Sequence, residues 1–207
     1  MTQTRYPIPA ESFRCATEVK HSRFIATTEP ADSAEAALAF ISRIKQEFPD
    51  ASHNCWAYLI GPPGSTDRIG LSDDGEPHGV AGKPMLTTIQ HSGIGDIALV
   101  VTRYFGGTKL GKGGMVKAYT EVSKAALEQL KIAEKINWVK LSIQVGYQLL
   151  DNIERLLPEF EAKLTDKQFA EKICLTLKLP EENLSDLRTR LIDLSSGKIE
   201  FPKQEES

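Results

Sequence analysis

A glycine-rich segment that follows an apolar run is the feature that most constrains how this chain folds. Residues 98–101 (ALVV) have the composition of a buried strand, and the chain continues into a cation, two aromatics and two glycines. Five glycines lie between Gly106 and Gly114, and apolar residues recur at helical spacing from Met115 onward. The segment therefore predicts a strand, a glycine-rich loop and a helix, in that order.

Such a loop favours an anion. Glycines let the backbone approach a ligand closely, and the first N–H groups of the following helix carry the positive end of its dipole. Residues 103–124 hold five cations against one acid, although the whole chain has a formal charge of -3. We therefore expect nucleic-acid or phosphate contacts here. The predicted contact residues are Arg103, Tyr104, Phe105, Gly106, Gly107, Lys109, Lys112, Gly113, Gly114 and Lys117.

The same loop almost matches the phosphate-binding loop of nucleotide hydrolases. Gly106, Gly111 and Lys112 satisfy the pattern G-x-x-x-x-G-K, but Gly113 stands where a Ser or Thr should hold magnesium. This departure at a mechanistic position argues against nucleotide hydrolysis, and we assign no catalytic residue. The alternative is structural: the glycines only allow a tight connection between strand and helix.

The aromatic residues before the loop suggest a second kind of contact. An arginine beside exposed rings combines phosphate contacts with a stacking surface for unpaired bases. Strand alternation places Arg103 and Phe105 on one face and Tyr104 on the other. We therefore expect only one of the two rings to be free for stacking.

An acidic turn, Asp73-Asp74-Gly75-Glu76-Pro77, is the second irregular feature. It could bind a metal, act as an acid and base pair, or neutralise and orient the basic loop. Contiguous carboxylates in one turn usually cannot converge on a single ion, and Asp-Gly and Glu-Pro are common turn dipeptides, so we assign no metal and no cofactor. The possible second cluster consists of His53, Asn54, Asp73, Asp74, Glu76 and Lys83.

The length and composition allow two domains. At 207 residues and 41% hydrophobic content, the chain can form one large domain or two modest ones with real cores. After residue 132 glycine becomes scarce and the charges are evenly spread, so we place a boundary near Lys135. We expect one domain over 1–135 and a smaller one over 136–207. Neither is basic overall, since basic and acidic residues number 15 and 15 in the first and 10 and 13 in the second.

Hydrophobic patterns and turn signals predict the order of elements. In the first domain we expect strands within 12–28, 53–60 and 68–72, and helices beginning near Ser33 and Gly82. From Trp138 the patterns predict strand, helix, strand, strand, helix and a final strand. This order favours a ferredoxin-like α+β sandwich.

The cellular compartment is predicted from the absence of membrane-spanning and signal segments in the sequence. No apolar run approaches the roughly 20 residues that span a bilayer, and the first residues contain no apolar signal core. Three widely separated cysteines argue against a disulfide framework. We therefore expect a cytoplasmic protein without a membrane partner.

The chain also resembles a known family. Several motifs occur in the family order over about residues 12–130, and the match extends to the second domain by length and pattern only. These motifs resemble the IMPACT protein family, above all its bacterial YigZ-type members. The matching motifs are Ser22-Arg23-Phe24-Ile25, His53-Asn54-Cys55, Ser72-Asp73-Asp74-Gly75-Glu76-Pro77, Ala81-Gly82-Lys83-Pro84-Met85, Arg103-Tyr104-Phe105-Gly106-Gly107, Leu110-Gly111-x-Gly113-Gly114 and Lys117-Ala118-Tyr119.

The resemblance implies a fold of the ribosomal protein S5 domain 2-like type, followed by a ferredoxin-like domain. This tandem is similar to the fourth and fifth domains (IV and V) of elongation factor G. The first fold recurs in RNA-binding and ribosome-binding proteins and in small-molecule kinases. Eukaryotic IMPACT proteins regulate translation through a stress-kinase pathway with an additional N-terminal domain, which we do not expect here, so that role is not carried over.

Three hypotheses follow. The first is a non-enzymatic protein that binds RNA or the ribosome and is connected with the regulation of translation. The second is a phosphate-binding enzyme acting on a nucleotide or a small phosphorylated substrate. The third is a protein-interaction module, whose partners the sequence does not identify.

Overall fold

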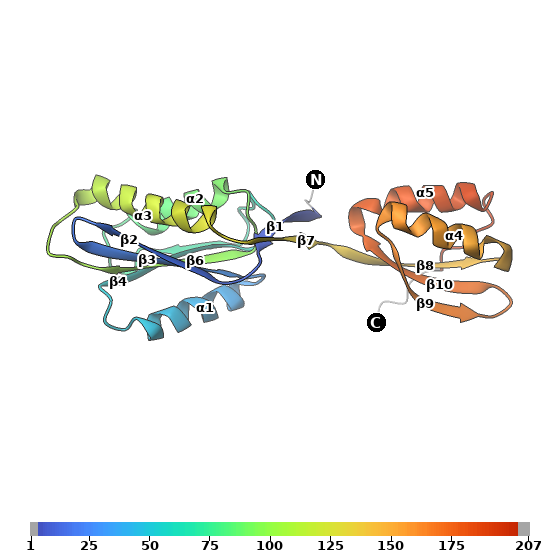
Figure 1. Cartoon of the computed structure of the whole chain (residues 1–207), viewed down its shortest axis with the longest axis horizontal. Coiled ribbons are helices and arrows are strands. Elements are labelled where there is room, and N and C mark those ends of the chain that lie inside the picture. The colour runs from blue at the N-terminus through green and yellow to red at the C-terminus, as the bar shows by residue number, and fades with distance from the viewer. Residues whose placement is uncertain (1–3, 203–207) are drawn as a thin grey trace. The chain divides into compact units, whose positions relative to one another are not determined.

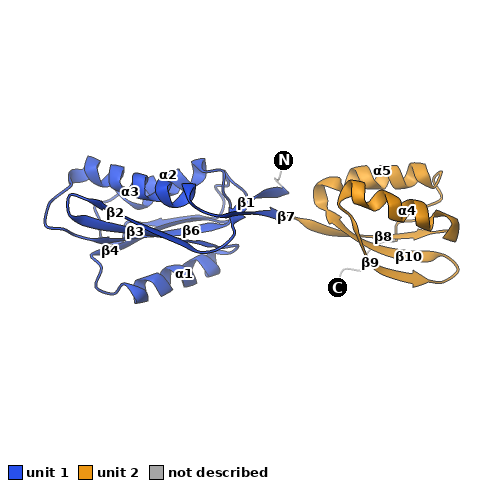
Figure 2. Ribbon diagram, in the orientation of Figure 1, with its two compact units in different colours: residues 1–135 blue, residues 136–207 orange. Residues whose placement is uncertain are grey.

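The computed structural model describes residues 4–202 and divides the chain into two compact units, 1–135 and 136–207 (Figure 2). Each unit combines a β-sheet with helices and has its own hydrophobic core. The mixed α+β class predicted from the sequence is therefore confirmed.

Unit 1 is built on a five-stranded sheet in the order β2-β3-β6-β4-β5, in which all neighbours are antiparallel. Because β6 lies in the centre and is covered on both faces, its side chains are buried up to the last residue, and its sequence is a continuous apolar run. The strands are β2 (Phe13–Val19), β3 (Ser22–Pro30), β4 (His53–Leu59), β5 (Ile69–Ser72) and β6 (Ile97–Tyr104).

Helices cover both faces of this sheet (Figure 1). Helix α1 (Ala34–Glu47) packs on one face with Ala98 and Val100, whereas α2 (Gly82–His91) and α3 (Gly111–Glu128) pack on the other with Leu99 and Val101. Alternate residues of one strand thus serve two separate cores.

The first helix begins as predicted. Ser33 is its N-cap, and the Ser33 hydroxyl accepts a hydrogen bond from the Ala36 N–H at 3.1 Å.

Two features of unit 1 differ from the sequence prediction. First, β1 (Arg5–Pro9) pairs with β7 (Ile132–Ile136) in a separate two-stranded sheet that we did not predict. The Tyr6 hydroxyl donates to Asp96 at 2.8 Å, which fixes β1 against the main sheet. Second, α3 begins at Gly111, so Lys112, Gly113 and Gly114 lie in its first turn and not in the loop.

Unit 2 is a three-stranded antiparallel sheet in the order β8-β10-β9, with α4 and α5 on one face (Figure 1). Its strands and helices are β8 (Trp138–Val145), α4 (Leu150–Leu156), β9 (Lys163–Phe169), β10 (Ile173–Pro180) and α5 (Leu184–Leu194). Short 3-10 segments cover Tyr147–Leu149, Leu157–Phe160 and Glu181–Asn183.

The predicted final strand of unit 2 is wrong as a full element. Only Glu200 pairs, in a single bridge with Gln144 of β8. Pro202 follows two residues later and has no N–H to continue a ladder, which is one reason that the pairing ends here.

Candidate functional site

The acidic turn and the basic segment meet at one end of unit 1, where β6 ends and α3 begins. Arg103 Nη1 donates to Glu76 Oε1 at 2.6 Å, and the two side chains are only 6% and 3% exposed. One of the roles considered for the acidic turn, neutralising a cation of the basic segment, is therefore present in the fold through Glu76.

Arg103 itself lies in the protein interior. Its guanidinium stands over the Phe24 ring at 5.4 Å and the Phe105 ring at 5.6 Å, and Nη2 donates to Ser22 Oγ at 3.4 Å. Only 5% of Arg103 is exposed, and its charge is already paired with Glu76, so it is not offered to a phosphate at the surface. The geometry therefore favours Arg103 as the residue that holds the end of the site in place, with other cations left to contact a ligand.

A buried polar network continues behind this ion pair. The Tyr119 hydroxyl donates to Glu76 Oε1 at 2.9 Å, and Cys55 Sγ lies 3.3 Å from the same hydroxyl. Burial raises the pKa of the Cys55 thiol to about 12 and also raises the pKa of Tyr119, so both groups stay protonated at neutral pH. A protonated, buried thiol is not a nucleophile, and this arrangement supports Glu76 without offering covalent chemistry.

The carboxylates of Asp73 and Asp74 both accept hydrogen bonds from backbone N–H groups. Asp73 accepts hydrogen bonds from the N–H groups of Gly79, Ala81 and Gly82 at 2.8, 3.0 and 2.9 Å, and so satisfies the start of α2. Burial on its own raises the pKa of Asp73, but these three donors outweigh it and hold the pKa below its usual range.

Asp74 points the other way, to β4. It accepts from the Asn54 N–H at 2.7 Å and from Lys45 Nζ at 2.5 Å, and these contacts hold its pKa below the usual range although burial opposes them. His53 Nδ1 donates to the Asp74 carbonyl oxygen at 2.8 Å, and His53 Nε2 lies 3.8 Å from Glu76 Oε2. The three acidic side chains thus face three different sets of partners. Within residues 4–202, no group of three or more His, Cys, Asp or Glu side chains is placed to hold a metal ion.

The start of α3 is built differently from the other two helices of unit 1. Ser33 caps α1 and Asp73 satisfies the first turn of α2, whereas no side chain of residues 4–202 caps α3. Lys109 and Lys112 flank this open end and are both exposed. Free N–H groups, the positive end of the helix dipole and two lysines together form a surface suited to an anion.

The glycines of this segment have different structural roles. A Cβ on Gly106 would lie 1.9 Å from the carbonyl oxygen of His21, so this glycine lets the segment pack on the β2–β3 turn. Gly107 and Gly111 have φ of +84° and +73°, which disfavour other residues. Gly113 has no positive φ, and a Cβ there would meet no atom within 4 Å. The fold therefore gives no reason for glycine at position 113, and an approaching ligand would give one.

Two exposed cations at this end were missed in the sequence analysis. Lys20 and Arg23 lie at the β2–β3 turn, which the Gly106 N–H contacts through a 3.2 Å hydrogen bond to Ser22 Oγ. In the sequence they lie more than 80 residues before the glycine-rich segment. The only sequence feature that marked this turn was the family motif beginning at Ser22. We call the surface formed by Lys20, Arg23, Lys109 and Lys112 the basic end of unit 1.

The remaining predicted contact residues lie around the basic end. Phe105 is 50% exposed, whereas the Tyr104 hydroxyl donates to Asp50 at 2.9 Å. Phe105 is therefore the ring more available for stacking. Lys117 lies on the second turn of α3 and forms a 3.7 Å ion pair with Glu121.

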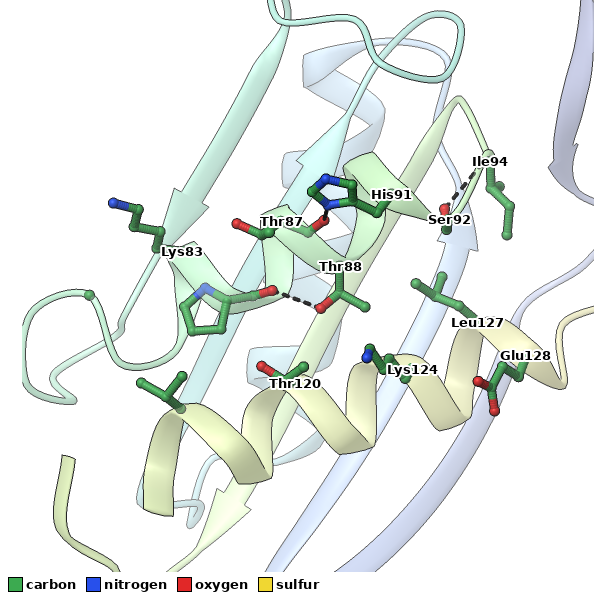
Figure 3. Close-up of a pocket in the computed structure, with 13 residues that line it drawn as sticks. Lys83, Thr87, Thr88, His91, Ser92, Ile94, Thr120, Lys124, Leu127 and Glu128 are labelled. Atoms are coloured by element: carbon green, nitrogen blue, oxygen red, sulfur yellow. Dashed lines mark hydrogen bonds between the residues drawn. The ribbon is translucent and has the colours of Figure 1, made fainter. Parts of the chain in front are cut away.

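Lys83, the last member of the predicted second cluster, forms no ion pair with the acidic side chains of residues 4–202. It lines a groove of about 770 Å³ between α2 and α3, shown in Figure 3. Lys124, from α3, is the second lysine of the groove, and neither lysine has an ion-pair partner among residues 4–202. Figure 3 shows that Lys124 and Thr120 come from α3 and face the helix that carries Thr88. The sequence patterns did not single out this groove.

Both units match known domain families. Residues 20–127 match the Impact N-terminal domain, and residues 143–198 match a domain of unknown function, DUF1949. The chain therefore belongs to the IMPACT family, which confirms the resemblance inferred from its motifs. Membership of this family implies a regulatory protein associated with translation.

Individual relatives extend the similarity over nearly the whole chain. IMPACT family member YigZ of Escherichia coli (strain K12) is 39% identical over 96% of this chain and 98% of its own length. YvyE of Bacillus subtilis (strain 168) is 32% identical over 90% of this chain and 85% of its own length. A solved structure titled as a crystal structure of a hypothetical protein is 38% identical, with a TM-score of 0.68, and the match covers 99% of this chain and 100% of that one.

Among residues 4–202, no helix is both long enough and apolar enough to cross a membrane.

Proposed function

We propose that this protein is a non-enzymatic RNA-binding or ribosome-binding protein that acts in the regulation of translation in the cytoplasm. The observation that carries the proposal is the uncapped start of α3, with Gly113 open to the outside and exposed Lys109 and Lys112 beside it. A backbone phosphate would accept hydrogen bonds from the first N–H groups of α3, and the two lysines would neutralise neighbouring phosphates. Phe105 offers a stacking face for an unpaired base.

The finer fold assignment belongs to the same proposal. We take unit 1 as S5 domain 2-like and unit 2 as ferredoxin-like, similar to domain V of elongation factor G. In unit 2, the bridge of Glu200 to Gln144 lies on the edge of β8 away from β10. The sheet order is then last segment, first strand, third strand, second strand, which supports a βαββαβ arrangement.

Salt dependence tests the proposal. We expect a labelled single-stranded RNA to bind at low salt and to dissociate steeply as salt rises, because each neutralised phosphate releases counterions. The double variant Lys109→Ala/Lys112→Ala should bind more weakly and lower the slope of log affinity against log salt by about 1.4, since each single-strand contact contributes about 0.7.

A matched control removes the same charge elsewhere. Lys131 follows the far end of α3 and Lys198 lies in unit 2, and both are exposed. Lys131→Ala/Lys198→Ala should leave the slope unchanged. The proposal fails if neither RNA nor ribosomes bind at 50 mM salt, or if the basic-end variant behaves like its control.

The groove between α2 and α3 favours a second candidate function, the binding of a nucleotide or small phosphorylated substrate. Its size suits a small molecule, and Lys83 and Lys124 supply two cations that have no ion-pair partner within the described residues. Titration calorimetry with a nucleotide panel and magnesium should show binding, and Lys124→Ala should abolish it. If no compound of the panel binds, this second function is excluded.

The third function, a protein-interaction module, is tested by a pull-down. Protein partners that are still recovered after nuclease treatment would indicate this function.

A further inference from the structure

The open face of the unit 2 sheet carries a row of lysines. In the strand register, Lys140 of β8 lies opposite Lys178 of β10, and Lys178 lies opposite Lys163 of β9. Leu141 and Leu177, their sequence neighbours, face the core with α4 and α5. Because side chains alternate along a strand, the three lysines lie together on the face that these helices do not cover, and all three are exposed.

The row places like charges opposite each other on neighbouring strands. Like charges directly opposite each other on neighbouring strands are destabilising. Lys163 and Lys178 have no carboxylate partner among residues 4–202 that would offset the repulsion. An anion bound across the strands would offset it.

An aromatic ring lies within the same surface. Trp138 precedes Lys140 by two residues and so lies on the same face of β8. Its ring centroid is 5.9 Å from Lys163 Nζ and 5.4 Å from Lys178 Nζ, and the residue is 37% exposed. Two positive charges and one accessible ring thus form a single compact surface.

The rest of this face is polar, and the face as a whole carries fewer negative than positive charges. Ser142 pairs with Thr176, and Gln144 pairs with Cys174 in the rows that follow the lysines. Two carboxylates lie in the paired register of this face within residues 138–202. Asp166, opposite Thr176, accepts from Gln168 at 2.9 Å. Glu200, bridged to Gln144, forms an ion pair with Lys172. Unit 2 as a whole has more acidic than basic residues, so its charges are segregated and this face is distinctly basic.

We propose that this face, the lysine row with Trp138, is a binding site for single-stranded nucleic acid, separate from the basic end of unit 1. Lys163 and Lys178 contact successive phosphates, and Trp138 stacks on a base between them. A single strand fits because its bases are free to stack on an aromatic ring, whereas a duplex offers this face only phosphates. The site goes beyond the proposed function, because it assigns unit 2 a ligand of its own.

The fluorescence of Trp138 provides a direct test. The chain contains two tryptophans, and Trp56 is stacked on Tyr58 at 5.8 Å in unit 1. Addition of a short single-stranded oligonucleotide, RNA or DNA, to the full chain should quench tryptophan emission. Trp138→Phe should remove that quenching. Trp138→Ala should weaken binding at least about fivefold, which is the lower end of the effect of one base-stacking contact.

The lysines are tested by a charge-matched pair of variants. Lys163→Gln/Lys178→Gln should weaken the strand at least about fivefold and lower the salt slope by about 1.4. The control is Lys167→Gln/Lys172→Gln in the same unit, since Lys167 pairs with Glu154 of α4 and Lys172 pairs with Glu200. The control should keep wild-type quenching. If the thermal midpoint of Lys163→Gln/Lys178→Gln stays level or rises, the variant is folded. Its weaker binding then comes from the missing charges.

The outcomes separate the two proposals. Quenching that persists in Lys109→Ala/Lys112→Ala supports the unit 2 site whatever happens to the basic end. Absence of quenching in the wild type, or quenching that Lys163→Gln/Lys178→Gln leaves unchanged, overturns the unit 2 site alone. Equal affinity for duplexes, or binding to phosphatidylglycerol vesicles without binding to single strands, also overturns it.

Discussion

Replacing Gly113 by alanine should make the protein more stable and less able to bind RNA. Gly113 is the third residue of α3, it has no positive φ, and a Cβ there meets nothing within 4 Å. Glycine within a helix costs about 0.5–1 kcal/mol relative to alanine. Gly113→Ala should therefore raise the free energy of unfolding by up to about 1 kcal/mol, which is a rise of about 2–6 °C in Tm for a unit of this size.

The same methyl group should obstruct the ligand. It occupies space beside the first N–H groups of α3, where we place a phosphate. Loss of one hydrogen bond to a charged group costs about 1.5–3 kcal/mol, which weakens binding by about 10- to 150-fold. Thermal melts and RNA anisotropy titrations measure the two effects, and the rise in Tm shows that the variant is folded. A more stable variant with wild-type RNA affinity would refute the argument that position 113 is kept open for a ligand.

Three further predictions concern the framework of unit 1. Glu76→Gln leaves the Arg103 charge buried without its partner, so urea unfolding should show a loss of about 3–5 kcal/mol, and a loss below about 1 kcal/mol would contradict a buried ion pair. Burial by itself raises the pKa of Asp96, but the Lys135 ammonium and other donors hold it below its usual range. The stabilisation from Asp96 is thus complete well above the unfolded pKa of about 3.9 and is lost as the pH falls through the folded value. Asp96→Asn should therefore flatten the profile of unfolding free energy against pH below about pH 5. Gly106→Ala forces a methyl group against a backbone carbonyl of the β2–β3 turn and should lower Tm, which a level or higher Tm would disprove.

Local patterns predicted the local structure of the basic end. The apolar run of β6 and the Ser33 cap of α1 depend on neighbouring residues, and both are where the sequence placed them. Arg103 shows where such reasoning stops. In a glycine-rich, cationic segment an arginine suggests a phosphate contact, but its partner Glu76 is 27 residues away, and only the fold reveals that the pair is buried.

Non-local pairing hid the remaining features. Nothing near β1 in the sequence indicates that it pairs with β7 more than 120 residues later. The unit 2 lysines were hidden in the same way. Lys140, Lys163 and Lys178 are scattered among acids along the chain, so the sequence of this unit looked evenly charged. Strand register alone places them in one row.

The pairing of β1 with β7 also constrains the order of folding during synthesis. β1 leaves the ribosome before the main sheet, but its partner strand, Ile132–Ile136, emerges only after the whole five-stranded sheet and α3 have been made. Until then β1 lacks its partner strand, and its contacts with the main sheet include the hydrogen bonds of Pro7 and Tyr6 to Gly95 and Asp96. Closing so long a loop is slow because the chain entropy is lost before the contacts form. The two-stranded sheet of unit 1 therefore forms last during synthesis, when the segment that leads into unit 2 has been made.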